Sequence, residues 1–424
     1  MTVRLDFGRE GMHVELPEDR VKHVLGLMPA PPLDDPDGTI RAALENPIGT
    51  LPLRELAQGK SDACLVICDI TRPVPNEAIV KAMLPVLAES GIPATSVKIL
   101  VATGTHRPST DAEKLAMLGE EVLSSGVQVI DHYCEDPETN RFIGVSPSGI
   151  DVYLDTHWLD ADLKITIGLI EPHFMAGYSG GRKLVMPGIA SMATIQAWHS
   201  PKFLEHDNAV NGVTVGNPVH EENTAIASMA PADLICDVTI DEKRRTTGVF
   251  CGHWIEAWKA GCEFVAGQVR PPIPDYVDIV VTSGGGYPLD ATFYQVVKGI
   301  VAAYPIARPG GTVIIAAQLS EGVGSHHFSG TLESCQIRQA LVAAMSAPGW
   351  VPIPEQWQPE MLARATRERR VIVVIPDDEP RAAMAACHVE VARSVEEALE
   401  RVGGDGTIAV TPKGPYVTPF VVNG

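Results

Sequence analysis

The segment GLIEPHFMAGYSGGRK, residues 168–183, closes an apolar run that begins at residue 163 and has the composition of a buried strand. A histidine, three glycines, an arginine and a lysine follow. Glycine lets a backbone pass close to another group because it has no Cβ, and free N–H groups in such a loop suit a phosphate. The spacing is not that of a Walker A loop. A glycine-rich surface turn is the plain alternative, but His173 and Lys183 at a strand end favour a site.

Strands alternate with helices on both sides of this segment, as is typical of parallel sheets. We therefore expect an α/β protein with two α/β domains and mainly parallel sheets. The other buried strands are expected at residues 63–70, 96–102 and 127–132, and then at 276–282, 312–317, 370–375 and 407–411.

A proline-rich stretch, residues 268–274, is the best linker in the chain, since proline cannot continue a helix. A chain of 424 residues is also too long for one ordinary core. We place an N-terminal cofactor-binding domain at 1–268 and a C-terminal domain at 269–411, with the tail 412–424 possible as a return to the first domain. Ligands of such sheets bind beyond the carboxyl ends of the strands. Two domains joined by a proline-rich linker could open and close around a site, so we expect the active site in the cleft between them.

The composition fits a soluble globular enzyme, with 45% hydrophobic and 20% charged residues. A formal charge of −20 argues against nucleic-acid binding and against an anionic membrane surface. The first residues alternate like a strand and do not form a signal peptide, and no apolar run reaches membrane-spanning length. The eight cysteines include no CxxC pair, which favours reduced thiols and a cytoplasmic protein.

Polar side chains gather after four of the expected strands. Parallel strands bring such ends to one edge of a sheet, so these groups are candidates for a shared site. The helix after the fourth strand carries three of them at spacings of three and four, which share one helix face. The candidates are Asp69, Thr71 and Arg72; Thr105, His106 and Arg107; Glu171, His173 and Lys183; and, after glycines 284–286, Tyr294, Gln295 and Lys298.

Two histidines on neighbouring strand ends suit proton transfer, because neutral imidazole accepts a proton near neutral pH. Arg72 can hold a carboxylate through a two-point fork. His199 has no Cys, Asp or His partner at a metal-ligand spacing, so the residues do not predict an all-protein zinc site.

Together these motifs resemble the nickel-pincer lactate racemase family, in the order that the family has them over residues 69–299. The longest one, which ends at Lys183, is the most specific. Beyond residue 300, only Trp357 matches a family aromatic near the cofactor. The motifs are Asp69-x-Thr71-Arg72-Pro73; Gly104-Thr105-His106-Arg107-Pro108; Glu171-Pro172-His173 through Gly177-Tyr178-Ser179-Gly180-Gly181-Arg182-Lys183; His199; and Gly285-Gly286-Tyr287-Pro288-Leu289-Asp290 with Tyr294-Gln295-x-x-Lys298-Gly299.

The resemblance implies a nickel-pincer nucleotide, a nicotinic-acid-derived mononucleotide that Lys183 holds covalently and whose nickel His199 ligates. His106 and His173 would be the catalytic acid/base pair. The substrate-binding residues would be Arg72, Tyr294, Gln295 and Lys298. The other cofactor-binding residues would be Asp69, Thr71, Gly177, Ser179, Gly180, Gly181 and Trp357.

The implied activity is racemisation or epimerisation of a 2-hydroxy acid by an isomerase. One histidine removes the hydroxyl proton, the α-hydrogen moves reversibly as hydride to the cofactor, and the other histidine serves the opposite enantiomer. The expected partners are the small acid and the enzymes that build the cofactor.

Alternatives remain at this point. The same cofactor could serve malate, a larger 2-hydroxy acid or a sugar acid epimerised at C2. A nicotinamide-dependent dehydrogenase is a different class, although no G-x-G-x-x-G opens a first helix with an acidic residue at the proper distance. A non-catalytic carboxylate- or phosphate-binding protein is a third.

Overall fold

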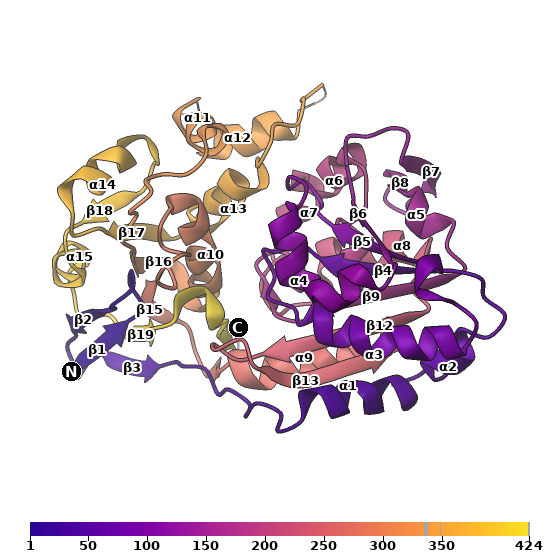
Figure 1. The fold of residues 1–424 in the computed structure, drawn as a ribbon. Helices are drawn as coiled ribbons and strands as arrows, with labels where there is room; N and C mark the ends of the chain where they lie inside the picture. Colours follow the sequence, from indigo (N-terminus) through magenta and orange to yellow (C-terminus); the bar gives the residue numbers. More distant parts are fainter. Residues whose placement is uncertain (335–337, 348, 423–424) are drawn as a thin grey trace.

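Two sheets form the framework of the chain, which the computed structural model describes over residues 1–334, 338–347 and 349–422. Within these residues each of the two sheets has six strands, and they lie in separate halves of the molecule (Figure 1). The expected α/β class with mainly parallel sheets is therefore confirmed. In this described part, no helix combines the length and apolar character needed to cross a membrane.

The first sheet has the order β13-β12-β9-β4-β5-β6. Its neighbouring strands run parallel, except that β12 and β13 form an antiparallel hairpin. The strands are β4 (Ala63–Cys68), β5 (Val97–Ala102), β6 (Gln128–Asp131), β9 (Leu163–Leu169), β12 (Leu234–Ile240) and β13 (Thr246–Gly252).

Strand β4 shows why this sheet is covered on both faces. Leu65 and Ile67 pack in one apolar cluster with Ile79 of α3 (Asn76–Glu89), whereas Cys64 and Val66 belong to the cluster on the opposite face. A continuous apolar strand is typical of a parallel sheet with helices on both sides. Full burial of each Leu or Ile side chain contributes about 1.5–3 kcal/mol, so the central strands are firmly fixed and their carboxyl ends are rigid supports.

The second sheet has the order β18-β17-β16-β15-β19-β3, and all of its neighbours are parallel. It is the framework of the C-terminal half. Its strands are β15 (Val277–Ser283), β16 (Ala307–Ala316), β17 (Arg370–Val374), β18 (Glu390–Ala392), β19 (Ile408–Thr411) and β3 (Val21–Val24).

The start of the chain lies with the second sheet, which differs from the division expected at residue 268. β3 pairs with β19, and the hairpin of β1 (Thr2–Leu5) and β2 (Met12–Glu15) buries Leu5 and Val14 in one cluster with Ile279. The alternation of a short hairpin shows that one face is buried, but not which sheet covers it. At the other end of the chain, β20 (Phe420–Val421) pairs with β14 (Pro272–Ile273).

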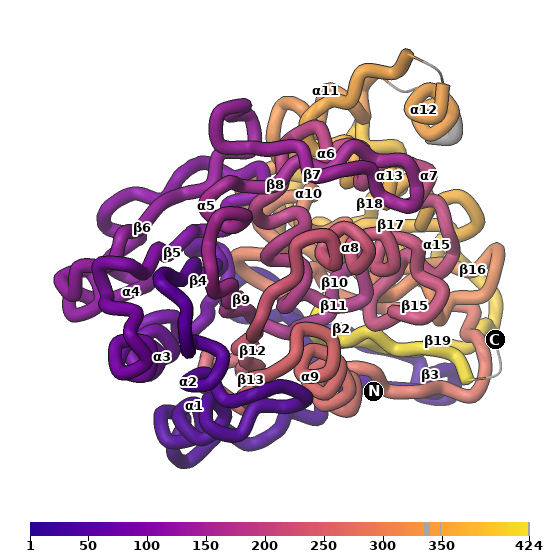
Figure 2. Tube along the Cα trace, turned by 90° about the vertical axis from the view of Figure 1, so that its right-hand side faces the viewer, coloured from indigo at the N-terminus to yellow at the C-terminus, as the bar shows by residue number. Residues whose placement is uncertain are grey.

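Two short hairpins lie between β6 and β12 in the chain. β7 (Asn140–Val145) pairs with β8 (Asp151–Asp155), and β10 (Pro172–His173) pairs with β11 (Gly177–Tyr178). In the C-terminal half, His326 and His327 begin a helix. The other helices, visible in Figures 1 and 2, are α1 (Pro36–Glu45), α2 (Leu53–Leu56), α4 (Asp111–Ser124), α5 (Thr156–Leu159), α6 (Met192–Trp198), α7 (Pro201–Leu204), α8 (Pro218–Ser228), α9 (Glu256–Val269), α10 (Phe293–Ala303), α11 (His326–Ser334), α12 (Arg338–Met345), α13 (Trp357–Ala365), α14 (Asp378–Ala383) and α15 (Val395–Val402).

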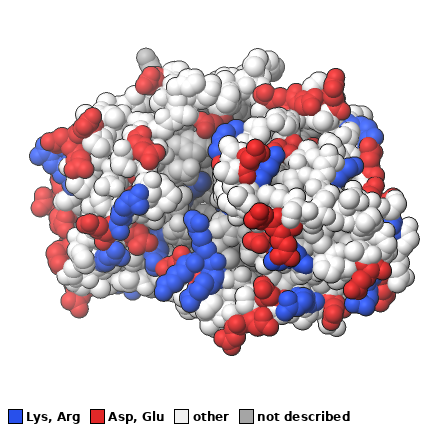
Figure 3. Space-filling view, viewed as in Figure 1, with Lys and Arg blue, Asp and Glu red and all other residues white. Residues whose placement is uncertain are grey.

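Helix α13 ties the two halves together. Arg364 donates hydrogen bonds from Nη1 to the carbonyl of Ala209 at 2.7 Å and from Nη2 to that of Asp207 at 2.7 Å. On the C-terminal tail, Lys413 pairs with Glu242 of the β12–β13 turn at 2.7 Å. A hollow with basic side chains along it separates the halves on the face shown in Figure 3. These contacts place α10 and α13 opposite the strand ends of the first sheet.

Candidate active site

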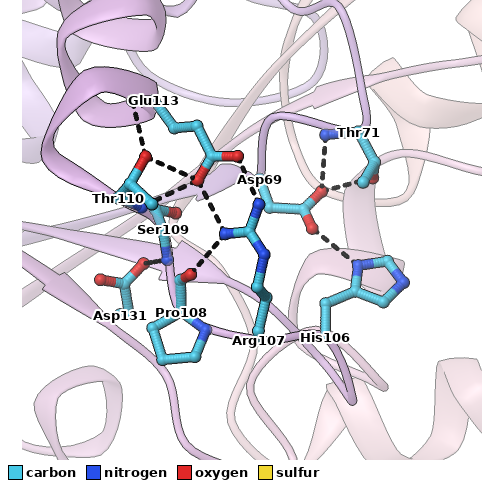
Figure 4. A network of polar contacts seen from close by, with 9 residues as sticks. All are labelled: Asp69, Thr71, His106, Arg107, Pro108, Ser109, Thr110, Glu113 and Asp131. Atoms are coloured by element: carbon cyan, nitrogen blue, oxygen red, sulfur yellow. Dashed lines mark hydrogen bonds and ion pairs between the residues drawn. The ribbon is translucent and has the colours of Figure 1, made fainter.

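The carboxyl ends of β4 and β5 bring Asp69 and His106 together. These strands are neighbours in the first sheet, and Nδ1 of His106 lies 2.7 Å from Oδ2 of Asp69 (Figure 4). Thr71 donates to the other carboxylate oxygen of Asp69 from its hydroxyl, at 2.5 Å. The Thr71 side chain therefore orients Asp69, and Asp69 orients the imidazole.

The Asp69 carboxylate is ionised in this arrangement. Its 7% exposure would raise its pKa, but the hydrogen bonds from His106 and Thr71 outweigh burial and lower the pKa below its usual value. A carboxylate at Nδ1 holds the ring hydrogen there, so Nε2 presents a lone pair. The His106 side chain is 58% exposed, which leaves that lone pair accessible from the cleft.

Arg107 does not join this pair, although it is the next residue. Its guanidinium forms two hydrogen bonds to Glu113, at 2.8 and 2.6 Å, and the dashed lines in Figure 4 join it to Glu113 and Pro108 rather than to Asp69. Glu113 is also part of the capping box that begins α4. Arg107 therefore supports the helix start rather than the site.

Arg72 follows β4 and forms an ion pair with Glu171, which follows β9. The Glu171 charge is the main reason that the pKa of Arg72 rises above its ordinary value. Both side chains are partly exposed, at 40% and 36%. The group expected to bind a substrate carboxylate thus already contacts a carboxylate of the protein.

His173 lies in the short hairpin that follows β9. Its Nδ1 accepts hydrogen bonds from the backbone N–H groups of Ala176 at 3.2 Å and Met175 at 3.4 Å. Nδ1 is therefore an acceptor, and in the neutral ring the hydrogen lies on Nε2. Removal from water lowers the pKa of His173 well below its ordinary value, and the charges of Lys183 and Arg72 act in the same direction.

Lys183 lies in the short 3₁₀ helix η2 (Gly181–Leu184) that ends the glycine loop. Its Nζ is 4.9 Å from the ring centre of Trp198. Burial lowers the pKa of Lys183 well below its ordinary value, and the nearby positive charges of Arg182 and Arg72 add to this effect. Lowering the pKa favours the neutral amine, which is the nucleophilic form.

His199 caps the end of α6 next to Trp198 and is 8% exposed. Its ring lies 4.4 Å from that of Trp198 and stacks at 4.6 Å on Trp357 of α13. Burial lowers the pKa of His199 to about 3, so the imidazole is neutral. Among the described residues, its buried Nδ1 has no hydrogen-bond partner.

The C-terminal half contributes α10, and the first two turns of this helix carry Tyr294, Gln295 and Lys298. Burial and the charge of Arg72 lower the pKa of Lys298 to about 8, while Glu171 opposes them. Lys298 also acts on the pKa of His173. Residues from both halves therefore meet around His173, Arg72 and Glu171.

The glycine loop is packed mainly against the protein itself. A Cβ on Gly177 would lie 2.5 Å from the carbonyl oxygen of Val213, and one on Gly180 would lie 2.7 Å from Oδ2 of Asp237. A Cβ on Gly181 would meet Trp258 at 3.0 Å. All three glycines have positive φ, so they are required for the local path of the chain.

Ser179 is committed to the same loop, since its hydroxyl donates to the carbonyl of Leu169 at 2.6 Å and accepts from the backbone N–H of Glu171 at 3.0 Å. Its hydroxyl fixes the exit of β9. The expected cofactor role of Ser179 and the glycines stays a prediction.

Sequence reasoning did not identify Trp198 or Asp237. Trp198 lies beneath the amine of Lys183 and beside His199, and its position directly before that histidine was the one signal available. Asp237 is fully buried in β12 against Gly180, and burial raises its pKa to about 7. An acidic residue inside an apolar strand was the signal there.

Comparison with known proteins places this architecture. Sequence models of the lactate racemase N-terminal domain and the lactate racemase C-terminal domain match residues 7–212 and 274–418. The lactate racemase of Lactiplantibacillus plantarum is 37% identical over 381 residues, 89% of each chain. That of Thermoanaerobacterium thermosaccharolyticum is 34% identical over 423 residues, 98% of each chain.

Solved structures agree with these relationships. The structure of the lactate racemase apoprotein from Thermoanaerobacterium thermosaccharolyticum matches with a TM-score of 0.91 at 34% identity, over 99% of this chain and 100% of that one. A crystal structure of a Thermotoga maritima protein shares the fold, with a TM-score of 0.65 at 18% identity over 91% of this chain and 98% of that one. From the two domain models and these near full-length relatives, the chain belongs to the lactate racemase family.

Proposed function

We propose that this chain is a racemase or epimerase of a 2-hydroxy acid that works with a nickel-pincer nucleotide attached to Lys183. The observation that carries the proposal is the grouping of Lys183, Trp198 and His199. A lysine with a depressed pKa, a flat aromatic surface and a neutral imidazole with an unpartnered Nδ1 adjoin one another. The two relatives described above are named lactate racemases.

The residues present fit such a group. Lys183 would form the covalent bond through its neutral amine, and His199 would offer a nitrogen to the nickel, with Trp357 packed against its other face. Neutral imidazole is a common ligand of nickel. When bound, the nucleotide would supply the acceptor for the α-hydrogen of the substrate.

The chain itself would bind and orient the acid and move its proton. Arg72 and Lys298 would hold the carboxylate, with Tyr294 and Gln295 beside them on α10. His106, with Nδ1 held by Asp69, is set to accept the hydroxyl proton at Nε2. His173 would serve the opposite enantiomer. In its neutral ring the hydrogen lies on Nε2, because Nδ1 accepts the backbone N–H groups of Ala176 and Met175. Returning a proton to the substrate oxygen would require the imidazolium, which leaves a neutral ring with its hydrogen on Nδ1, and abstraction of a proton would be the reverse of this step.

The assay is racemisation by holoenzyme made together with the cofactor-building enzymes. Single enantiomers of lactate, malate and a C4 2-hydroxy acid are incubated and resolved by chiral chromatography. We expect at least one of them to reach an equal mixture of enantiomers, and the Lys183→Arg variant to leave it unchanged. A holoenzyme that carries the adduct but racemises none of a broad panel of 2-hydroxy acids would contradict the proposal.

A further inference from the structure

The Glu171 carboxylate is already paired with the guanidinium of Arg72, which the proposed function assigns to the substrate carboxylate. Its carboxylate forms an ion pair with Nη1 of Arg72 in the partly exposed part of the site. The residue is fixed through its backbone, because its N–H donates to Ser179 Oγ at 3.0 Å and its carbonyl accepts the N–H of Ser179 at 2.9 Å. The ion pair is therefore part of the framework that follows β9.

The Glu171 charge reaches beyond Arg72. Burial and Arg72 lower the pKa of Lys298, and the Glu171 charge acts against them. Burial raises the pKa of Tyr416 on the C-terminal segment, and the Glu171 charge adds to that effect. The Glu171 charge thus acts on both cations assigned to the substrate, one from each half of the chain. Asp69 is a second carboxylate whose charge acts on Arg72, although its hydrogen bonds are with His106 and Thr71.

The protein already supplies negative charge where the substrate carboxylate would bind. Arg72 and Lys298 contribute two positive charges, and the carboxylates of Glu171 and Asp69 both act on Arg72. No surplus positive charge is left for a second carboxylate on the substrate. A second carboxylate on the substrate would lie in a site that already holds Glu171, and like charges at such short range repel strongly.

Building on the proposed function, we propose that Glu171 is the residue that restricts the site to 2-hydroxy acids with a single carboxylate and selects against dicarboxylates such as malate. It does so by remaining on Arg72 while the substrate binds alongside. If Glu171 instead swung away from Arg72 when the substrate binds, its competition for Arg72 would lower the affinity for monocarboxylates and dicarboxylates by the same factor. It would then not discriminate between the two classes of acid.

The test compares the unaltered protein with Glu171→Gln, which keeps the shape of the side chain and removes its charge. Glu121→Gln is the matched control, because Glu121 pairs with Lys81 at 2.5 Å far from the site and is 72% exposed. Titration calorimetry measures the binding of propionate and malonate to cofactor-free protein at pH 6.5. Lys298 is protonated at that pH, since its pKa is about 8.

We expect the unaltered protein and Glu121→Gln to prefer propionate. In Glu171→Gln, the ratio of malonate to propionate affinity should rise by about tenfold or more, since removing one fixed charge near a dianion relieves repulsion that survives partial screening. An unchanged ratio in Glu171→Gln, or a preference for malonate in the unaltered protein, would overturn the proposal.

A second measurement uses holoenzyme, with kcat/KM for lactate and for malate in each variant. The malate-to-lactate ratio should rise in Glu171→Gln by a similar factor. Binding by cofactor-free protein does not depend on racemisation, so the two proposals fail separately. Selective anion binding without any racemisation would contradict the proposed function, whereas racemisation with unaltered selectivity would contradict the role of Glu171.

Discussion

Nδ1 of His106 lies 2.7 Å from Oδ2 of Asp69, and this contact sets which nitrogen of the ring can accept a proton. The Asp69→Asn variant should disturb it, because an amide can turn its NH₂ toward Nδ1 and shift the ring hydrogen to Nε2. We expect kcat/KM to fall by about 10²–10⁴ in both directions, the range for a positioned acid/base group.

Chiral assays of the Asp69→Asn holoenzyme from each enantiomer measure this loss. Asp136→Asn is a suitable control, since Asp136 caps a turn by accepting the N–H of Glu138 at 2.9 Å. Activity of Asp69→Asn within threefold of the control would show that the His106 orientation does not limit turnover.

His199 should hold the metal rather than the organic part of the cofactor. In His199→Ala, the mass adduct on Lys183 is expected to persist, while the nickel content per protein falls by at least about tenfold, since loss of a ligand costs no less than loss of its supporting group. Inductively coupled plasma mass spectrometry and intact mass report the two quantities separately. His157→Ala serves as the control, and full nickel occupancy in His199→Ala would refute the assignment.

Lys298 should give the pH profile its alkaline limb. Burial and the charge of Arg72 lower its pKa to about 8, so its positive charge is present below that pH and is lost as the pH rises through it. We expect kcat/KM to decline above about pH 8. Lys298→Arg, which stays charged, should retain its own activity to higher pH, and an identical alkaline limb in both proteins would assign that limb to another group.

Asp237 should make the protein less stable as the pH rises. Its folded pKa of about 7 exceeds the ordinary 3.8, so the folded state binds more protons between these values and loses stability as the pH climbs from about 4 to 7. Asp237→Asn removes this titration. Its unfolding free energy relative to the unaltered protein should rise between pH 5 and pH 8, by about 2.5 kcal/mol, since about two pH units of the shift lie in that window.

Urea unfolding at the two pH values measures the Asp237 effect. The difference between the two proteins at pH 5 serves as the baseline, because the carboxyl group of the folded protein is then neutral like the amide. A difference that is the same at both pH values would mean that Asp237 is not protonated in the folded state.

The strand ends could be predicted from the sequence because the physics is local. An uninterrupted apolar run such as residues 63–68 has few alternatives to a buried strand, and parallel neighbours then deliver Asp69 and His106 to one edge. The pairing of β3 with β19 could not be predicted in this way. A four-residue alternating strand specifies a buried face, but its partner is chosen by packing across almost the whole chain.

The glycine loop shows a second limit. A sequence pattern tells us that Gly180 has no Cβ, but not whether a ligand or the protein fills that space. In the structure the side chain of Asp237 fills it, from a strand more than fifty residues further along.

The stacking of Trp357 on His199 likewise depends on the contact between the two halves, which Arg364 of the same helix helps to hold. For Trp357 the family resemblance supplied what the spacing of residues could not.

The most direct test of the account is peptide mass spectrometry of holoenzyme combined with its nickel content. We expect a nucleotide adduct on the peptide that contains Lys183, with about one nickel per adduct, and no adduct in Lys183→Arg. The lactate racemase of Lactiplantibacillus plantarum, prepared in the same cells, serves as the reference. An unmodified Lys183 in a preparation where the reference protein is loaded would contradict the central claim.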